Sequence, residues 1–369
     1  MIRVCIGVFA VVACGYAFAA DTQDPPSTVS ADTKSEFVAA YRKYEALMAE
    51  DKSEEALPHA EVAYRLGTEI YGRNHKNTAA LALNYGQLLI KQNQVKAAIP
   101  VLDDAIEQYR QIYGKDAKEL VDPLMSRGNA TGAWAPKQQL VYYDAALDIA
   151  RATLNPDDLL LAQLNLEAGI HLLRDGNVEQ SKAFFDAAYE QYKKQVAASD
   201  ARFVVTSFWL GKYYLTSEKP RIAEPYFNQV LAAFEGAGAP ENTLATATHA
   251  LLVMTYQQLG EPARATPHYV AVGKMQPWSD SALQTPLYRL PPSYPPDAKG
   301  REGMAVLEFT IDADGYVREP KLLRTDGSDS FGEPALAAIS GWRYAPRFVD
   351  GNPVATPGMQ AEVRFKLVP

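Results

Sequence analysis

The chain has 369 residues, enough for two or three domains with hydrophobic cores of their own, and its content of 47% hydrophobic and 22% charged residues is ordinary for a folded protein. Its formal net charge is −8, and no basic cluster of the size that nucleic acid demands is evident, so we expect no nucleic-acid partner. Both cysteines, Cys5 and Cys14, lie near the N-terminus, which leaves the rest of the chain without a disulfide framework or thiol chemistry.

Residues 1–20 have the features of a signal peptide. Arg3 supplies a positive charge, residues 4–13 are apolar, and Ala17-Phe18-Ala19 has the small-x-small pattern of a cleavage site. We therefore expect cleavage after Ala19 or near it, and export to the periplasm.

Two alternatives for this leader stay open. The run Val11-Val12-Ala13-Cys14 resembles a bacterial lipobox, which would make Cys14 a lipidated first residue. The leader could also be retained as a membrane anchor. Its uncharged run over residues 4–20 reaches only about 25 Å at ~1.5 Å per residue, short of a ~30 Å hydrocarbon core.

Residues 35–277 repeat with a period of 42 residues. Proline, aromatic or histidine side chains recur at this step in six units: Pro58, Pro100, Tyr142, Phe184, Tyr226 and His268. Each unit reads as two amphipathic helices. In the second unit, Leu81, Tyr85, Leu88 and Leu89 mark one face of the first helix, and the second helix is expected to end at Gly114.

The third unit departs most from this pattern. Gly128, Gly132, Trp134 and Pro136 crowd the place where its hairpin should lie, so we expect a loop or a broken helix there.

The repeat resembles the tetratricopeptide repeat family, in a longer variant with about eight extra residues per unit. Turn residues between the helices, an aromatic pair early in the second helix and a Tyr113-Gly114 stop carry the resemblance. It implies a superhelix with a groove, lined mainly by the first helices, that binds peptides or protein segments. The candidate groove residues are Asn84, Lys91, Arg127 and Gln163.

A proline-rich linker is expected over residues 278–292, before a domain over residues 290–369. We expect few contacts to cross this linker, so that the repeats and the domain fold separately.

The domain is expected to have the order ββαβ. Residues 305–311 alternate as a strand, Asp312-Ala313-Asp314-Gly315 predicts a tight turn, and residues 317–324 predict the returning strand, with Pro320 at an edge or bulge. A capping box at Ser330 is expected to open a helix, and residues 360–368 alternate strictly as a last strand. The predicted fold class is therefore mainly α, a superhelical array of helix-turn-helix repeats followed by a small α+β domain.

This domain resembles the TonB C-terminal domain. The resemblance rests on these motifs taken together: Tyr294-Pro295, Ala298, Gly303, Asp314-Gly315, Phe331, Ala335-Leu336, Trp342-Arg343, Pro346, Gly351-Asn352-Pro353-Val354 and Val363-Arg364-Phe365. In that family a short segment of an outer-membrane receptor adds as a strand beside the last strand. The resemblance therefore implies a partner site made of Tyr294, Pro295, Gln360, Glu362, Val363, Arg364, Phe365 and Lys366.

The sequence shows no catalytic or metal-binding constellation. Its five histidines are scattered, with no HExxH, and no GxSxG motif occurs. The run from Asp312 to Gly315 has its glycine at the wrong position for an EF-hand, which favours a β-turn. We expect no enzyme activity, cofactor, metal or small-molecule substrate.

The sequence suggests three alternative functions. The first is a periplasmic adaptor that joins two proteins of the cell envelope, one of them an outer-membrane receptor by the family resemblance. The second is a TonB-type energy transducer with the leader retained as an anchor. The third is an enzyme such as a cell-wall hydrolase, against which the missing catalytic constellation argues.

Intact-mass measurement of the protein from its natural host tests the leader prediction. We expect a chain that begins at or near Ala20, because the apolar run is short and the cleavage motif follows it directly. A chain that still carries Met1 to Ala20 would contradict cleavage, and a lipid adduct on Cys14 would support the lipobox.

Overall fold

The computed structural model describes residues 29–132, 135–234, 243–275, 278, 284–298 and 300–366. The predicted leader, including Arg3, Cys14 and Ala19, lies outside the described residues, as does Trp134. The contacts divide the chain into two compact units that meet between Thr206 and Ser207, and each is described by itself.

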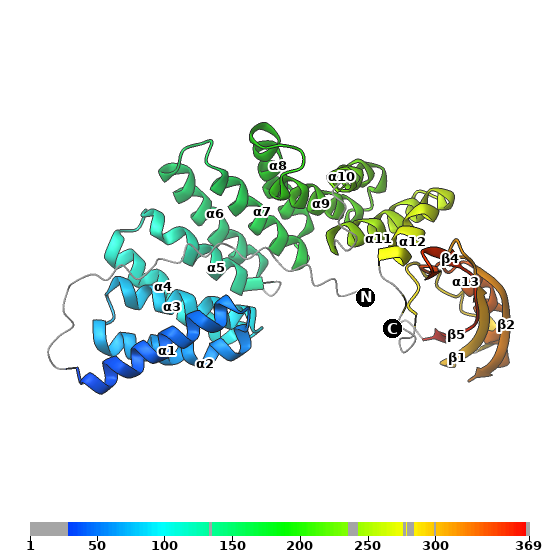
Figure 1. The fold of residues 1–369 in the computed structure, drawn as a ribbon, viewed down its shortest axis with the longest axis horizontal. Coiled ribbons are helices and arrows are strands. Elements are labelled where there is room, and N and C mark those ends of the chain that lie inside the picture. The colour runs from blue at the N-terminus through cyan, green and yellow to red at the C-terminus, as the bar shows by residue number, and fades with distance from the viewer. Residues whose placement is uncertain are drawn as a thin grey trace. The chain divides into compact units, whose positions relative to one another are not determined.

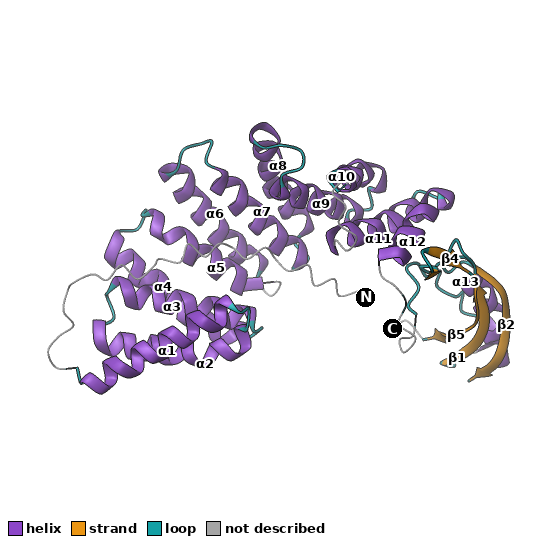
Figure 2. Ribbon diagram, viewed as in Figure 1, coloured by secondary structure: helices purple, strands orange, loops and turns teal. Residues whose placement is uncertain are grey.

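Helices in hairpin pairs follow one another along the chain up to Met275 (Figures 1 and 2). The compact unit that ends at Thr206 contains α1 (Ala31–Ala49), α2 (Ser53–Tyr71), α3 (Lys76–Lys91), α4 (Val95–Tyr113), α5 (Val121–Thr131), α6 (Pro136–Thr153), α7 (Leu159–Arg174) and α8 (Val178–Gln195). Next come α9 (Ala201–Thr216), which spans the boundary, and α10 (Pro220–Ala232), α11 (Thr243–Gln258) and α12 (Pro262–Met275). The array of helix-turn-helix repeats is confirmed, and each of the six recurring positions lies in a second helix.

A close approach between its two helices recurs in four hairpins. A glycine of the first helix lies where any Cβ atom would meet a large side chain of the second at 2.5–2.8 Å. The four pairs are Gly86 with Leu102, Gly128 with Tyr143, Gly169 with Phe185, and Gly211 with Phe227. These side chains are buried, so each glycine lets a large apolar group fill the space between the helices.

The third hairpin is less interrupted than its sequence predicts. Gly128 lies inside α5 and packs on Tyr143, so it does not break the helix. The chain turns instead at Gly132, whose φ of 58° favours glycine, and Pro136 takes the first position of α6, where its missing N–H costs nothing. The expected loop therefore lies at Gly132, whereas Gly128 is part of α5, because sequence alone did not show that Gly128 serves packing.

Helix ends follow the predicted glycine stops in the second hairpin. Gly114 caps α4 with a φ of 98°, a backbone conformation that other residues rarely adopt.

The C-terminal domain contains a three-stranded antiparallel sheet and one helix. The strands are β1 (Gly303–Ile311), β2 (Val317–Asp326) and β5 (Thr356–Phe365), in the order β2-β1-β5, and the helix is α13 (Gly332–Ser340). The predicted order ββαβ is confirmed, with an additional hairpin of β3 (Arg347–Val349) and β4 (Asn352–Val354) between α13 and β5.

Alternation along β1 and β5 places one face of the sheet in the core. Ala305, Leu307, Phe309 and Ile311 are buried, and Phe331, just before α13, stacks on Phe365 with ring centroids 4.3 Å apart. The predicted bulge in β2 is present, since Glu308 pairs with Lys321 but Thr310 with Arg318.

Two local predictions in the domain need correction. The hydroxyl that accepts a backbone N–H at this helix start belongs to Ser328, which caps a short 3-10 turn over Asp329–Phe331, and not to Ser330. The last strand begins at Thr356, earlier than the predicted Gln360, because Pro357 and Gly358 interrupt the alternation without ending the pairing with β1.

Contacts do cross the proline-rich linker, contrary to expectation. Trp278, just after α12, packs against the core of the C-terminal domain. Leu287 and Tyr288, just before the domain, pack against the core of the last helical hairpins. The composition predicts an extended linker, but the large apolar side chains of the linker pack on both the C-terminal domain and the last helical hairpins.

Gly169→Ala tests the close approach within a hairpin. Alanine favours a helix over glycine by about 1 kcal/mol, yet its Cβ would lie 2.8 Å from Phe185 Cδ1. We expect a loss of about 1–3 kcal/mol in unfolding free energy, as for an overpacked core. Urea unfolding followed by circular dichroism measures it, with the exposed Arg174→Ala in the same helix as control. A variant as stable as the wild type would show that Phe185 can move away from the added Cβ without a loss of stability.

Candidate functional site

The last strand, β5, offers an unpaired edge. Within the described sheet it pairs only with β1, through Met304 with Arg364, Val306 with Glu362 and Glu308 with Gln360. An edge strand leaves alternate backbone N–H and C=O groups without a ladder partner, and a further strand can satisfy them.

The predicted β5 residues divide by face. Gln360, Glu362, Arg364 and Lys366 are exposed, as predicted. Val363 and Phe365 are only 2% and 3% exposed, so they hold the strand in place and offer a partner their backbone alone.

An ion pair lies along the exposed face of β5. Arg364 donates to Glu362 Oε2 at 2.8 Å, and both side chains are open to solvent. Such a pair contributes about 0–1 kcal/mol to stability. Charges on an edge strand also oppose indiscriminate pairing between copies of the chain.

A bulge limits the usable edge of β5. Ile311 pairs with Thr356 and Phe309 with Met359, so Pro357 and Gly358 both face a single residue of β1. Gly358 has a φ of 72°, and a proline has no N–H to donate. The regular edge therefore runs from Met359 to Phe365.

Tyr294 is brought to the C-terminal end of β5 through two aromatic rings. Its ring, 36% exposed, meets Phe331 edge to face at 6.1 Å, and Phe331 in turn stacks on Phe365. The Tyr294 hydroxyl donates to the carbonyl of Arg301 at 2.9 Å, and the carbonyl of Pro295 accepts from the Ala298 N–H. The structure thus joins the two predicted parts of the partner site.

The predicted groove residues lie on first helices but differ in surroundings. Asn84 and Gln163 are half-buried on α3 and α7. Lys91 is exposed, with its Nζ 2.7 Å from Asp51. Arg127 is only 5% exposed, donates to Asp103 at 2.6 Å and to Thr131 at 2.7 Å, and its guanidinium lies 4.7 Å from the Tyr142 ring centre. Its donors therefore join α5 to α4.

Polar contacts between successive first helices were missed. Gln87 donates to Ser126 at 2.9 Å, and Asn129 donates to Glu167 at 2.8 Å while accepting from the Tyr143 hydroxyl at 2.7 Å. Burial raises the pKa of the Glu167 carboxyl. Gln87 and Asn129 each follow a hairpin glycine, one period apart, and this spacing could have revealed them.

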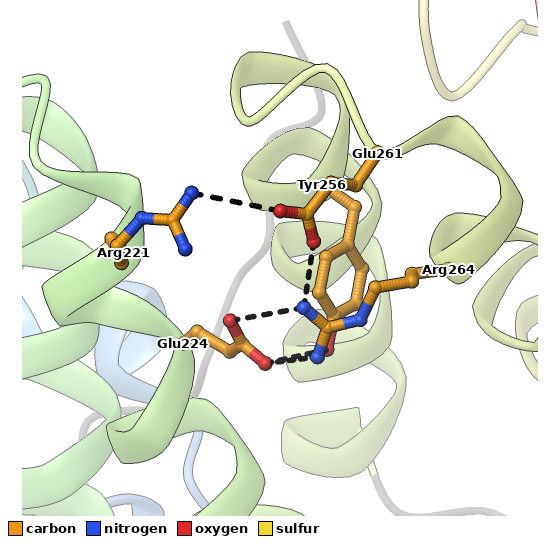
Figure 3. Close-up of polar contacts among 5 residues, drawn as sticks. All are labelled: Arg221, Glu224, Tyr256, Glu261 and Arg264. Carbon is orange, nitrogen blue, oxygen red and sulfur yellow. Dashed lines mark hydrogen bonds and ion pairs between the residues drawn. The ribbon is translucent and has the colours of Figure 1, made fainter.

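A charged cluster joins α10 to the last hairpin, and Figure 3 shows its side chains pointing toward one another. Arg264 contacts Glu224 and donates to Glu261 at 2.7 Å, and its guanidinium lies 4.3 Å from the Tyr256 ring centre. Arg221 reaches Glu261 at 3.6 Å, and the Tyr256 hydroxyl donates to Glu224 at 3.2 Å. We name these five residues the α10–α12 clasp.

Two histidines of the last hairpin face each other. The Nδ1 atoms of His249 and His268 are 2.8 Å apart, and the Tyr256 ring stacks on His268. Burial lowers the pKa of both imidazoles, that of His268 to about 4 with further help from His249 and Arg264. In the described part of the chain, no three histidine, cysteine or acidic side chains gather as metal ligands.

Comparison with known families identifies the C-terminal region. Residues 291–367 match the family model described as Gram-negative bacterial TonB protein C-terminal. This region is a TonB C-terminal domain. Residues 38–111 match a tetratricopeptide repeat model, so the chain joins tetratricopeptide repeats to the TonB domain. Both matched families are protein-interaction modules.

One relative and several solved structures are similar to parts of the chain. Protein TonB of Vibrio cholerae serotype O1 is 37% identical over 78 residues, which are 21% of this chain and about a third (32%) of that protein. The TonB2 protein from Vibrio anguillarum is 34% identical, covers 26% of this chain and 93% of its own, and has a TM-score of 0.20. BtubC (BKLC) from P. vanneervenii is 14% identical, covers 70% and 99%, and has a TM-score of 0.46.

Among the described residues, no helix is both long enough and apolar enough to cross a bilayer.

The half-buried pair of His249 and His268 predicts acid sensitivity in the last hairpin. The unfolded chain protonates His268 near pH 6.5, whereas the folded chain resists protonation down to about pH 4. The unfolded state therefore binds more protons between these values, so stability is present above about pH 6.5 and is lost as the pH falls toward 4. We expect His268→Gln to flatten this decline, as measured by urea unfolding at a series of pH values. An equal decline in variant and wild type would contradict the assignment.

Proposed function

We propose that this protein is an adaptor of the cell envelope that works in the periplasm. Its TonB C-terminal domain adds a strand of one partner to β5, and its tetratricopeptide repeats hold a second protein. The observation that carries this proposal is the open edge of β5 beside Tyr294.

Strand addition fits the chemistry of this edge. Backbone groups from Met359 to Phe365 supply the hydrogen bonds, while Val363 and Phe365 keep the strand flat against its own core. The exposed Glu362 and Arg364 offer one charge of each sign, which suits a polar partner strand in a fixed register. An outer-membrane receptor is the partner that the family resemblance suggests.

The repeats supply the second binding surface in this proposal. First helices present half-buried Asn84 and Gln163 and exposed Lys91, and the pair of Asn129 and Glu167 adds a carboxamide and a carboxyl between neighbouring hairpins. Groups of this kind hydrogen-bond the backbone and polar side chains of a peptide. Arg127 acts in the proposal by holding α5 on α4.

A TonB-type energy transducer is the second candidate, favoured by the 37% identity to protein TonB in the matched segment. It requires residues 1–20 to remain as a membrane anchor, whereas the adaptor proposal has them removed as a signal peptide. The proposed division of the rest is repeats over 35–277, linker over 278–292 and TonB domain over 290–369. Both candidates share strand addition at β5, and the mass measurement of the N-terminus separates them.

Site-specific photocrosslinking tests strand addition, with the opposite edge of the same sheet as control. Gln360 on β5 and Lys321 on β2 both pair with Glu308, and Glu362 and Arg324 both pair with Val306. A photoreactive residue at 360 or 362 should give adducts with an envelope protein in living cells, whereas one at 321 or 324 should not.

The crosslinked sites should also show register. Adducts from positions 360 and 362 should fall about two residues apart on one short partner segment, because aligned strands advance together. Adducts equally strong from β2, or scattered along the partner, would refute docking by strand addition at β5.

A further inference from the structure

The last hairpin of a repeat array has a problem that inner hairpins do not share. Each hairpin buries its apolar face against its neighbours, so a terminal hairpin needs a cap that covers the exposed side. In the described residues α12 is the last helix of the array, yet its Tyr269 is only 1% exposed and Val272 only 2%. Something other than a further hairpin covers it.

The TonB domain supplies part of that cover by direct backbone contact. A Cβ atom at Gly273 of α12 would lie 2.5 Å from the carbonyl oxygen of Pro346 and 3.2 Å from the ring of Phe348. One turn earlier, a Cβ at Gly315 in the β1–β2 turn would lie 3.6 Å from Tyr269. At Gly273, helix and domain are therefore so close that a larger residue would clash.

Polar and aromatic groups surround this contact. The hydroxyl of Thr266 on α12 lies 3.3 Å from that of Tyr316. The guanidinium of Arg343 lies 3.9 Å from the Tyr316 ring centre, and the backbone of Arg343 exchanges hydrogen bonds with Tyr288. An arginine cation over a tyrosine ring is attracted by the electrons of the ring face, which stabilises this contact.

The linker ties the two parts together in both directions. Trp278 leaves α12, packs into the core of the domain and donates from Nε1 to the carbonyl of Ala345 at 3.1 Å. Leu287 and Tyr288 approach the domain but pack into the core that contains Phe227, Tyr256 and Tyr269. The residue that follows α12 therefore helps to fill the core of the domain, and the residues that precede the domain help to fill the core of the last hairpins.

We propose that the TonB C-terminal domain is the terminal cap of the repeat array. It covers the apolar face of α12 through Tyr316, Arg343 and the Pro346–Phe348 segment, and it makes the last hairpin and the sheet one cooperative unit. The α10–α12 clasp then joins this unit to the fifth hairpin. The proposal does not depend on what β5 binds.

Hydrogen exchange of the full chain, read by mass spectrometry, tests the cap from the side of the domain. Tyr316→Ala removes a contact to α12 without changing the repeats, and Lys321→Ala, at an exposed position of the neighbouring strand β2, is the control. If the domain caps the array, Tyr316→Ala speeds exchange in α11 and α12 by about tenfold, and Lys321→Ala leaves it unchanged. Unchanged exchange in α11 and α12 with Tyr316→Ala would overturn the proposal.

Gly273→Ala tests the cap from the side of the repeats, with exposed Lys274→Ala as control. Alanine strengthens a free helix relative to glycine, so a helix that was not covered would exchange more slowly. The cap predicts the opposite sign, with faster exchange in α12 and in residues 343–348, because the added Cβ meets backbone at 2.5 Å. Slower exchange in α12 would refute the contact even if the variant folds well.

Discussion

The repeat array depends on how closely the two helices of a hairpin can approach. At Gly86, Gly128, Gly169 and Gly211 the absence of a Cβ lets a leucine, tyrosine or phenylalanine from the second helix sit directly on the backbone of the first. This contact fixes the distance between the helices, and with it the surface that each hairpin presents to the next. Gln87 and Asn129, whose side chains join successive first helices, each lie next to one of these glycines.

The same constraint explains how much of the array could be predicted. A period of 42 residues and apolar stripes at helical spacing predict the hairpins, because each helix must bury one apolar face against its neighbours. The sequence pattern does not predict whether a single glycine serves helix packing or a turn. Gly128 looks like a helix breaker until Tyr143 is seen above it, and Gly132, four residues later, is the true stop. A turn glycine and a packing glycine differ only in their long-range partners.

In the TonB domain, too, the local sequence pattern predicts burial but not the contacts between residues that are far apart in the sequence. Strict alternation in β1 and β5 predicts which residues are buried, and the predicted Val363 and Phe365 are indeed buried. Whether a strand lies at an edge depends on the order of all strands, which came from the family resemblance. The contacts of Trp278, Leu287 and Tyr288 were missed because proline content describes the linker backbone, whereas its large side chains decide what it touches. Arg127 was assigned to a groove by helical phase alone, which does not reveal the carboxylate of Asp103 beside it.

The place of β1 in the sheet has a mechanical consequence. β1 is hydrogen-bonded on one side to β2 and on the other to β5, over most of its length. Tension applied to β5 along its own axis would load the row of β1–β5 hydrogen bonds together, in shear, so that many must fail at once. Tension across the sheet would instead open them one after another, from Thr356 or from Phe365. A partner docked on β5, as proposed above, would therefore resist tension along the strand and would be released more easily by tension across the sheet.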